Sequence, residues 1–507
     1  MSDRDPDVVV IGSGPNGLVA ACMLARHGLR VLVLEANTRR PGGALGSEEL
    51  TLPGFVHDVG AGFFPFAKSS PAFIDLDLES VGLRWDNARF ESCHPALDGS
   101  YAAISRDLAL SAKHFGTSKD GERWRKLCEF HASVEERLFG LLLRPFPALG
   151  SLFQLGLVDA ARVMSMFAVS SGALARRLFE SDAAQRVLPS VALHVLIGPD
   201  DWFSAGLAYM LGLTASTGGY AVPIGGAQRV TDSMLTLLER HGGRLRLGAR
   251  VARVVVKNRR AEGVVLEDGT EIAANRAVVA DTGAPALLLN LVDRSHVPSS
   301  ILRRLKRFEY GPGTFKVDWA LAGAVPWSCD VARESAVVHT GEDVSDLARF
   351  TREVRRGLLP EQPYLVIGQH SIIDPSRAPG KQQTLYCYSR VPSRVTPGWD
   401  AHRERYADTI EARIEALAPG VRQLVLGRRI TAPPDLEATN ENLVGGDLGG
   451  GSNAWNHQLL FRPFFPYFRH RMPIERLYLA SSYTHPGAGV HGMCGYNAAA
   501  MVLKDVG

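Results

Sequence analysis

Cysteine is sparse in this sequence, and no cysteine lies close to another. Among 507 residues there are 6 cysteines and no Cys-X-X-Cys pair, which argues against a disulfide framework and a cysteine-based metal site. Neither an HExxH nor a GxSxG motif is present, so metal and acyl-transfer chemistry have no support. We therefore predict a reducing compartment and no metal.

Strong net charge and long apolar runs are also missing. A formal net charge of +3 leaves no electrostatic footprint for nucleic acid, so no nucleic-acid partner is expected. No uncharged apolar run reaches the ~18 residues that a membrane-spanning helix needs. The N-terminal residues lead directly into an apolar strand, without the pattern of a signal peptide. These absences predict a cytoplasmic location.

The stretch from residue 7 to residue 35 has the pattern of a dinucleotide-binding fold. An apolar run over residues 8–11 predicts a buried strand, which leads into the loop GSGPNG. A helical pattern then continues to residue 28, and a second buried strand is expected over residues 31–34. The acidic Glu35 closes the pattern.

Each glycine of this loop has a structural role in such a fold. Gly12 permits a tight turn, Gly14 lets the backbone approach a pyrophosphate, and Gly17 lets the helix pack closely on the strand. Glu35, roughly 20 residues further on, is placed to accept hydrogen bonds from ribose hydroxyls. A purely structural loop is the alternative, and the two flanking strands and the closing acid argue against it.

Two later segments favour the same kind of site. Gly42 and Gly43 follow Glu35 and would let the chain pass close to a bulky, flat cofactor, although a simple turn is the alternative. The nucleotide fold is expected to resume near residue 218, with a helix over 228–241 and strands over 250–257 and 262–266.

The segment from residue 138 to residue 213 is rich in apolar residues, and its role stays open. It is interrupted by arginines, and two prolines break the helical pattern near its start. A helical bundle that buries itself is one interpretation. An apolar substrate cavity or a face that touches a membrane is the other.

The last two hundred residues divide into a sheet and a glycine-rich end. Alternating patterns over 310–321 and 383–391 predict an antiparallel sheet, and a helix is expected over 403–418. Near the C-terminus, a strand over 476–480 leads through the loop SSYTHPGAGVHGM into an alanine-rich helix. A glycine loop at a helix N-terminus suits negative charge that develops beside the helix dipole.

Taken with these motifs, the chain resembles the phytoene desaturase-like FAD oxidoreductases over nearly its full length. The matching pieces include IGSGPNGLVAACMLARHG, the PGG after LE, PIGGAQRVTDSML and LYLASSYTHPGAGVHGMCGYNAA. The chain looks closest to the carotene ketolase-like bacterial branch, within the wider flavin amine oxidase superfamily. Three departures loosen the transfer of exact contacts. The glycine pair lies one residue further from Glu35 than usual, Ala44 follows this pair where arginine is usual, and serines replace the glycine and the small or acidic residue common before THPG.

The resemblance implies an α/β fold in which an α+β substrate domain, an antiparallel sheet with helices, is inserted into a discontinuous Rossmann-like domain. The FAD-binding domain would comprise residues 1–100, 218–295 and 440–507, and the substrate domain residues 101–217 and 296–439. Carried over to this sequence, the cofactor-binding residues are Gly12, Gly14, Pro15, Asn16 and Gly17 at the pyrophosphate, Glu35 and Ala36 at the ribose, Gly42 and Gly43 near the flavin, Val251 at the adenine, and Gly489, Val490, Gly492 and Met493 at the isoalloxazine and ribityl end.

Two residues are candidates for catalysis. In flavin amine oxidases a lysine on a substrate-domain strand holds a water near flavin N5, and Lys316 has a similar sequence context. A solvent-facing lysine is the alternative. His491, in the flavin-facing loop, would donate to the flavin or relay a proton, or else satisfy a backbone carbonyl.

We therefore predict an FAD-dependent oxidoreductase, phytoene dehydrogenase-like, in which flavin accepts a hydride from a small hydrophobic substrate such as an isoprenoid or polyene. A saturase or ketolase, an amine-oxidase-like enzyme and a non-catalytic flavin-binding partner protein are the alternatives. Peripheral membrane contact is compatible with the apolar segment. The oligomeric state is not readable from the sequence.

Overall fold

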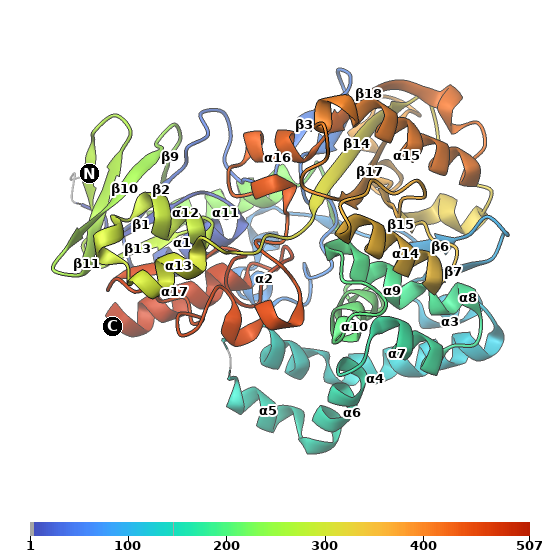
Figure 1. Cartoon of the computed structure of the whole chain (residues 1–507), viewed down its shortest axis with the longest axis horizontal. Coiled ribbons are helices and arrows are strands. Elements are labelled where there is room, and N and C mark those ends of the chain that lie inside the picture. Colours follow the sequence, from blue (N-terminus) through green and yellow to red (C-terminus); the bar gives the residue numbers. More distant parts are fainter. Residues whose placement is uncertain (1–4, 146, 507) are drawn as a thin grey trace.

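The computed structural model describes residues 5–145 and 147–506 and divides into two regions that lie side by side (Figure 1). The nucleotide region contains the parallel sheet and both ends of the described chain, at the left of the view. The substrate region contains a larger sheet at the upper right and a set of helices below it. The chain crosses between the two regions several times, so neither region is continuous in sequence.

A five-stranded parallel sheet forms the centre of the nucleotide region. Its first strand is completely buried and consists of β-branched residues, as expected when helices cover both faces of a sheet. The strand order is β19-β13-β1-β2-β9. The bounds are β1 (Val8–Ile11), β2 (Val31–Leu34), β9 (Arg244–Arg246), β13 (Ala277–Ala280) and β19 (Leu477–Leu479).

Three helices pack on this sheet: α1 (Pro15–Arg26), α11 (Gln228–Arg240) and α17 (Met493–Val506). The first and last of these touch closely, because a Cβ at Gly495 would collide with the carbonyl of Asn16. The N-terminal loop and the C-terminal helix are therefore brought together. A small sheet of β10 (Val251–Lys257), β11 (Arg260–Leu266) and β12 (Glu271–Ala273) completes the region. The pair β3 (Ser47–Glu49) and β4 (Val56–Asp58) lies beside the substrate sheet, where β4 contacts β17 (Figure 1).

The substrate region is built on a seven-stranded sheet with the order β18-β14-β17-β16-β15-β6-β7. All neighbouring strands are antiparallel except β15 and β6. The bounds are β6 (Phe90–Pro95), β7 (Tyr101–Ile104), β14 (Gly313–Leu321), β15 (Ser335–His339), β16 (Val366–Gly368), β17 (Gln383–Val391) and β18 (Val425–Thr431). Every residue of β14 is buried, since it lies inside the sheet and both of its faces are covered.

Two predicted domain boundaries lie elsewhere in the structure. β6 falls before residue 100 yet pairs with β15 of the substrate sheet, so the chain leaves the nucleotide region earlier than expected. α13 (Ser299–Leu305) falls after residue 296 yet packs into the apolar core behind β13. Both shifts arise from long-range pairing, which a local pattern does not contain.

The helices below the substrate sheet come mainly from the apolar segment. They are α4 (Ser118–Leu142), α5 (Leu149–Leu155), α6 (Leu157–Phe167), α7 (Ser171–Leu178), α8 (Asp182–Gln185), α9 (Val187–Ala192) and α10 (Ser204–Thr214). α9 and α10 are largely buried, so part of the segment packs on itself. Among the described residues no single helix is long and apolar enough to cross a membrane, and one bent pair, α6 with α7, passes by length and composition only.

The remaining elements are short or peripheral. They are the strand pair β5 (Trp85–Asp86) and β8 (Val222–Pro223), and the helices α2 (Pro71–Leu76), α3 (Leu108–Lys113), α12 (Ala284–Ala286), α14 (Val344–Arg355), α15 (Arg403–Leu417) and α16 (Pro433–Thr439).

Candidate active site

A large cavity of about 1930 Å³ runs between the two regions. One end is lined by the glycine loop after β1, and the other by helices and strands of the substrate region. Of the predicted site residues, those that line the cavity are Gly12, Gly14, Pro15, Asn16, Glu35, Ala36, Gly43, Val251, Lys316, Gly489, Val490 and His491.

The glycine loop leaves backbone exposed at the N-terminus of α1. Gly12 has a φ of +92°, and a Cβ there would lie 3.1 Å from the carbonyl oxygen of Asp281. A Cβ at Gly17 would lie 2.5 Å from the carbonyl oxygen of Gly12, so the helix packs closely on the loop. Gly14, Pro15 and Asn16, at the positive end of α1, line the cavity, which suits a pyrophosphate. Gly17 itself contributes packing and lies off the cavity wall.

Glu35 is held in place at the end of β2. Its Oε2 accepts hydrogen bonds from the backbone N–H and the hydroxyl of Ser13, at 2.9 and 2.5 Å. Its Oε1 accepts from the N–H of Asn37 at 2.8 Å. The carboxylate is therefore oriented at the cavity and retains lone pairs for ribose hydroxyls.

The glycine pair folds over the glycine loop. The N–H of Gly42 donates to the backbone oxygen of Ser13 at 3.1 Å, and Gly42 has a φ of +104°. A Cβ at Gly43 would lie 3.3 Å from the Cα of Gly14. Gly43 lines the cavity, whereas Gly42 turns the chain behind it.

The C-terminal loop reaches the same cavity through Gly489, Val490 and His491. Two of the residues predicted there lie away from the cavity wall. Gly492 packs on α1, where its Cβ would lie 2.9 Å from Val19, and Met493 is fully buried at the start of α17. Val251, at the start of β10, lines the cavity beyond Glu35.

His491 carries a buried donor without a partner. The N–H of Met493 donates to its Nδ1 at 3.1 Å, so the ring proton belongs on Nε2. Nε2 is buried and makes no hydrogen bond to the described part of the chain. Burial, with His485 nearby, lowers the pKa of His491 to about 4, so the ring is neutral at pH 7. The backbone of Ala488 and Gly487 acts on the ring and partly offsets this lowering of the pKa, so the surrounding loop, and not open cavity, encloses the N–H.

Lys316 is buried in the cavity wall, so the solvent-facing alternative is wrong. It is 5% exposed on β14 and forms an ion pair with Asp318, two residues further along the same face. Asp318 Oδ1 also lies 3.4 Å from Nδ1 of His57. Burial by itself would raise the pKa of Asp318, but Lys316 and His57 hold it below its usual value.

Burial also governs the protonation of Asp281, an acid that was not among the predicted site residues. Asp281 follows β13, at the carboxyl edge of the parallel sheet where ligands of such folds bind, and this position is the signal that could have revealed it. Its Oδ2 accepts a hydrogen bond from the N–H of Gly17 at 2.9 Å. Burial raises the pKa of Asp281 to about 7, and the nearby Glu35 adds to the shift.

We expect Asp281→Asn to flatten the pH dependence of stability between about pH 4 and 7. Because the folded pKa lies above the unfolded one, the folded protein binds the proton more tightly in this window. The wild type gains stability from this group at acidic pH and loses it as the pH rises through 7. Urea unfolding at several pH values measures the difference. The surface variant Asp232→Asn is the control, and coincident profiles for wild type and Asp281→Asn would contradict the raised pKa.

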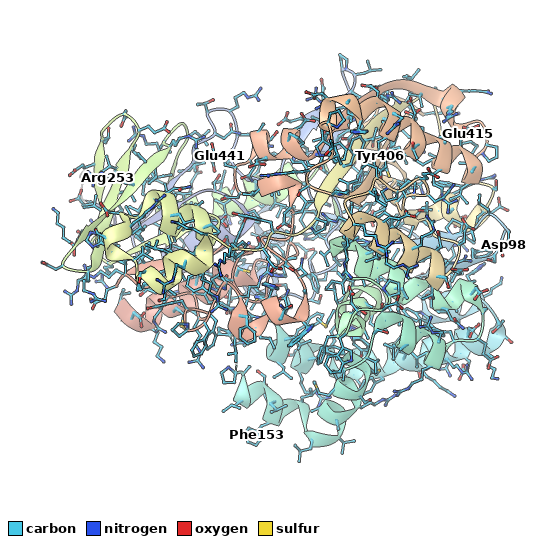
Figure 2. The ribbon with its side chains drawn as sticks, viewed as in Figure 1. Asp98, Phe153, Arg253, Tyr406, Glu415 and Glu441 are labelled. Carbon is cyan, nitrogen blue, oxygen red and sulfur yellow. The ribbon has the colours of Figure 1, made fainter. Side chains whose placement is uncertain are left out.

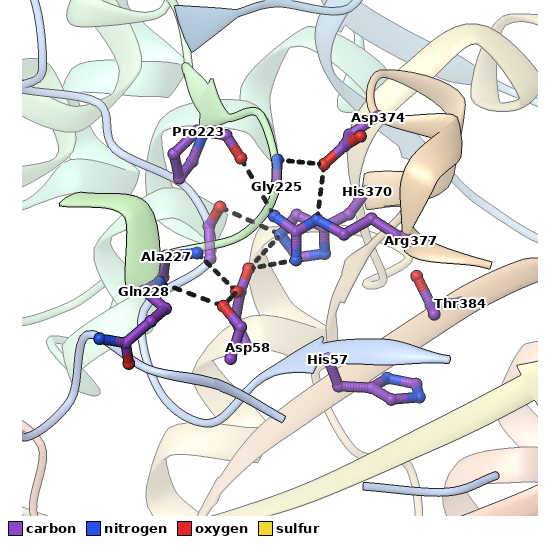
Figure 3. Close-up of polar contacts among 12 residues, drawn as sticks. His57, Asp58, Pro223, Gly225, Ala227, Gln228, His370, Asp374, Arg377 and Thr384 are labelled. Carbon is purple, nitrogen blue, oxygen red and sulfur yellow. Dashed lines mark hydrogen bonds and ion pairs between the residues drawn. The ribbon is translucent and has the colours of Figure 1, made fainter. Parts of the chain in front are cut away.

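A buried ionic network joins the two regions beside the cavity (Figure 3). Arg377 Nη1 lies 3.0 Å from Oδ2 of Asp58 on β4, and Arg377 Nε donates to Asp374 at 2.9 Å. Asp58 Oδ1 accepts from the N–H of Ala227 at 2.8 Å. Nε2 of His370 lies 3.0 Å from the carbonyl oxygen of Gly62, within hydrogen-bonding reach. The network therefore fixes the chain after β4, which forms part of the cavity wall.

The whole arrangement fits a dinucleotide cofactor with a ring system at the substrate end. Residues 16–317 match the family described as flavin containing amine oxidoreductase. The chain belongs to this family. The cofactor is accordingly FAD, and the chain is an FAD-dependent oxidoreductase of the amine oxidase and phytoene desaturase type.

Curated relatives match over almost the whole chain. The pyridine nucleotide-disulfide oxidoreductase domain-containing protein 2 of Rattus norvegicus is 27% identical, covering 99% of this chain and 94% of the relative. The neurosporene-forming phytoene desaturase of Rhodobacter capsulatus is 26% identical, covering 96% and 91%. Similarity to phytoene desaturases agrees with the predicted resemblance.

Solved structures share the fold. An oxidoreductase from Methanosarcina mazei superposes with a TM-score of 0.63 at 16% identity, covering 98% of this chain and 99% of its own. A wild-type putrescine oxidase bound to putrescine superposes with a TM-score of 0.61 at 17% identity, covering 99% of each chain. These likenesses establish the fold alone.

Proposed function

We propose that this flavoenzyme removes a hydride from a carbon of a largely apolar substrate held between the flavin-facing loop and the substrate region. The observation that carries the proposal is the character of the cavity wall in the substrate region. Its side chains come from α6, from α10 and the residue before it, and from the sheet. They are mostly aliphatic or aromatic, among them Phe167, Phe203, Leu207, Met210, Leu211, Val337, Val366, Tyr386 and Tyr388. Such a wall gains free energy by taking apolar surface out of water.

FAD, when bound, supplies the two-electron acceptor, and the chain supplies orientation and proton control. Gly12 and Gly14 would hold the pyrophosphate and Glu35 the ribose, which places the ring system toward the substrate region. The loop around His491 leads into α17, whose positive N-terminal end would stabilise negative charge at the ring edge. Lys316 is positioned to hold or move a proton in the cavity wall, with Asp318 and His57 keeping its ammonium in place.

Anaerobic bleaching of the flavin tests this function. The purified, FAD-loaded protein would be mixed with a panel of polyenes, isoprenoid alcohols, fatty acids and alkylamines, and absorbance near the visible flavin band recorded. Bleaching by an apolar substrate, with a product two hydrogens lighter, supports the proposal. Bleaching by alkylamines alone would move the function to amine oxidation. A product that gains hydrogen or oxygen would indicate a saturase or ketolase, and a flavin that responds to nothing would indicate a binding partner without turnover.

We further propose that the surface of α5 and α6 contacts an anionic lipid membrane, from which the substrate enters, while the protein is otherwise cytoplasmic. Phe153 and Leu157 are each 86% exposed and Val158 is 82% exposed. Phe153 projects from the lower edge of the molecule, away from the core (Figure 2). α6 ends at Phe167, which is buried and lines the cavity, so one helix leads from the exposed side chains to the cavity wall.

The segment that contains this face is rich in arginine, which suits an anionic lipid. Four arginines and one acidic residue lie between residues 144 and 178. The acid, Asp159, lies 3.5 Å from Arg137 and is thus neutralised. Arginine attracts anionic headgroups, and exposed apolar side chains enter the boundary of the acyl chains.

We expect the triple substitution Phe153→Ser, Leu157→Ser and Val158→Ser to abolish vesicle binding. Each of these side chains loses about 1.5–3 kcal/mol of burial in lipid. Flotation with phosphatidylcholine vesicles, with and without phosphatidylglycerol, measures the bound fraction, and the wild type should bind more to the anionic vesicles. The control replaces Ile74, Leu358 and Leu426, which are exposed elsewhere, with serine. A wild type that floats with neither vesicle would overturn the proposal.

A further inference from the structure

One face of β17 changes from aromatic to cationic along the cavity. Tyr386, Tyr388 and Arg390 alternate in sequence, so all three point to the same side of the sheet, and all three line the cavity. Opposite Arg390 on β14 lies Thr314, and opposite Tyr388 lies Lys316. The apolar cavity therefore has a cationic position about two residues, roughly 7 Å, along the sheet from Lys316.

Arg390 is a buried cation without a carboxylate partner. It is 5% exposed, and its Nε donates to the carbonyl oxygen of His194 at 2.7 Å. Its Nη2 donates to the same oxygen, and its Nη1 to the hydroxyl of Thr314. These acceptors are neutral and use three of the five N–H groups of the guanidinium. Two N–H groups and the positive charge are left for a ligand.

None of the charged groups near Arg390 neutralises its guanidinium. No carboxylate of the described residues forms an ion pair with its guanidinium, although burial of an unpaired charge is costly. Asp447 is the acid that acts on it from a distance, and its oxygens already accept from the N–H groups of Gly311, Gly449 and Gly451. Lys316, the other cation in this part of the wall, is already paired with Asp318. Arg390 is the cation whose charge is uncompensated here.

His194 adds a neutral donor beside this cation. Its half-buried ring lines the cavity, and its Nε2 lies 2.7 Å from Nε2 of His339. Nδ1 of His339 is buried without a partner among the described residues. A buried N–H without an acceptor costs more than a lone pair without a donor, so His339 carries its proton on Nε2 and donates to His194. Burial lowers the pKa of His194 to about 3, so the ring is neutral and its proton lies on Nδ1.

We propose that Arg390 and His194 form a subsite for a carboxylate, so that the substrate is an amphipathic acid with an apolar body. This inference rests on the proposed function and specifies its substrate. A guanidinium with two free N–H groups matches the two oxygens of a carboxylate, and the Nδ1–H of His194 serves as a third donor. The tyrosines and aliphatic side chains beyond Arg390 then hold the apolar body.

Ligands of equal chain length test the subsite without turnover. Decanoate, 1-decanol and decylamine would be titrated into the FAD-loaded protein by calorimetry, without oxygen. We expect decanoate to bind about 10- to 100-fold more tightly than decanol, the range for hydrogen bonds to charged groups, and decylamine to bind most weakly. Arg390→Gln should remove the preference for decanoate and leave decanol affinity within about twofold. His194→Phe should reduce the preference in part.

Arg394→Gln is the matched control, because Arg394 lines the same cavity near the end of β17 but is exposed. It should keep the preference. If Arg390→Gln loses FAD or unfolds at a lower temperature, Arg390→Lys is the alternative variant. It keeps the positive charge but lacks the two parallel N–H groups of the guanidinium, and it should bind decanoate at least tenfold less tightly than the wild type. Equal wild-type affinity for decanoate and decanol would overturn the subsite, as would a preference that survives in Arg390→Gln or a decanoate affinity that is unchanged in Arg390→Lys. Failure of flavin bleaching would instead overturn the proposed function, since these titrations require no reaction.

Discussion

Replacing Arg377 with leucine is expected to destabilise the protein by about 3–5 kcal/mol, because it leaves the carboxylates of Asp58 and Asp374 without their cation. Asp58 is 4% exposed and Arg377 is 1% exposed, so water cannot take the place of the guanidinium. Urea unfolding at pH 7 measures the free energy of unfolding. FAD content should fall as well, because the network fixes the chain after β4 on the cavity wall.

The pH dependence of this effect follows from the sign of the shift at Asp58. Burial would raise the pKa of this carboxyl, but Arg377 and His370 hold it below its usual value. The network therefore stabilises the wild type above the unfolded pKa, and this stability is lost as the pH falls through the folded pKa. Without Arg377, protonation of Asp58 relieves the buried charge, so the variant should be least impaired in acid.

An exposed ion pair provides the control for Arg377→Leu. Arg89 and Glu334 lie 2.7 Å apart with side chains 62% and 48% exposed. Removing this arginine by Arg89→Leu should cost at most about 1 kcal/mol, since water solvates both charges. Similar losses in the two variants would show that the buried network contributes no more than a surface pair.

The second large effect is expected at Lys316. Lys316→Met should slow substrate-dependent flavin reduction, flavin reoxidation by oxygen, or both, by at least about 100-fold, the lower end of the range for positioned acid–base groups. Methionine keeps the length of the side chain but removes the ammonium and leaves Asp318 with His57 alone. Stopped-flow absorbance of the flavin measures each half-reaction separately.

Two comparisons separate a role in the chemistry from a structural one. Photoreduction of the bound flavin by light and EDTA uses no substrate and should be unaffected by Lys316→Met, and FAD stoichiometry should also stay unchanged. The exposed lysine on β10, replaced as Lys257→Met, should behave like the wild type. Unchanged rates in both half-reactions of Lys316→Met would remove the residue from the mechanism.

Much of the nucleotide region was predictable because its signals are local. The buried strands β1 and β2 and the glycine loop lie within one short stretch, and each depends on its neighbours in sequence. The predicted strand over residues 383–391 coincides with β17 (Gln383–Val391). Strand and helix periods repeat every two to four residues, so a short window of sequence contains them.

The sequence by itself determined the family, the FAD cofactor and the end of the cavity where the nucleotide half of FAD is expected. The reason is that this half is bound by backbone groups, which glycines expose and which the sequence therefore reveals. Only the tertiary structure decided which side chains face the cavity. Gly492 turned out to pack on α1, Met493 to be fully buried, and Lys316 to be paired with Asp318. Arg390 and His194 are 196 residues apart, and no sequence pattern places one against the other. Burial and pairing of charges depend on contacts between distant segments, and these contacts form only when the two regions close around the cavity.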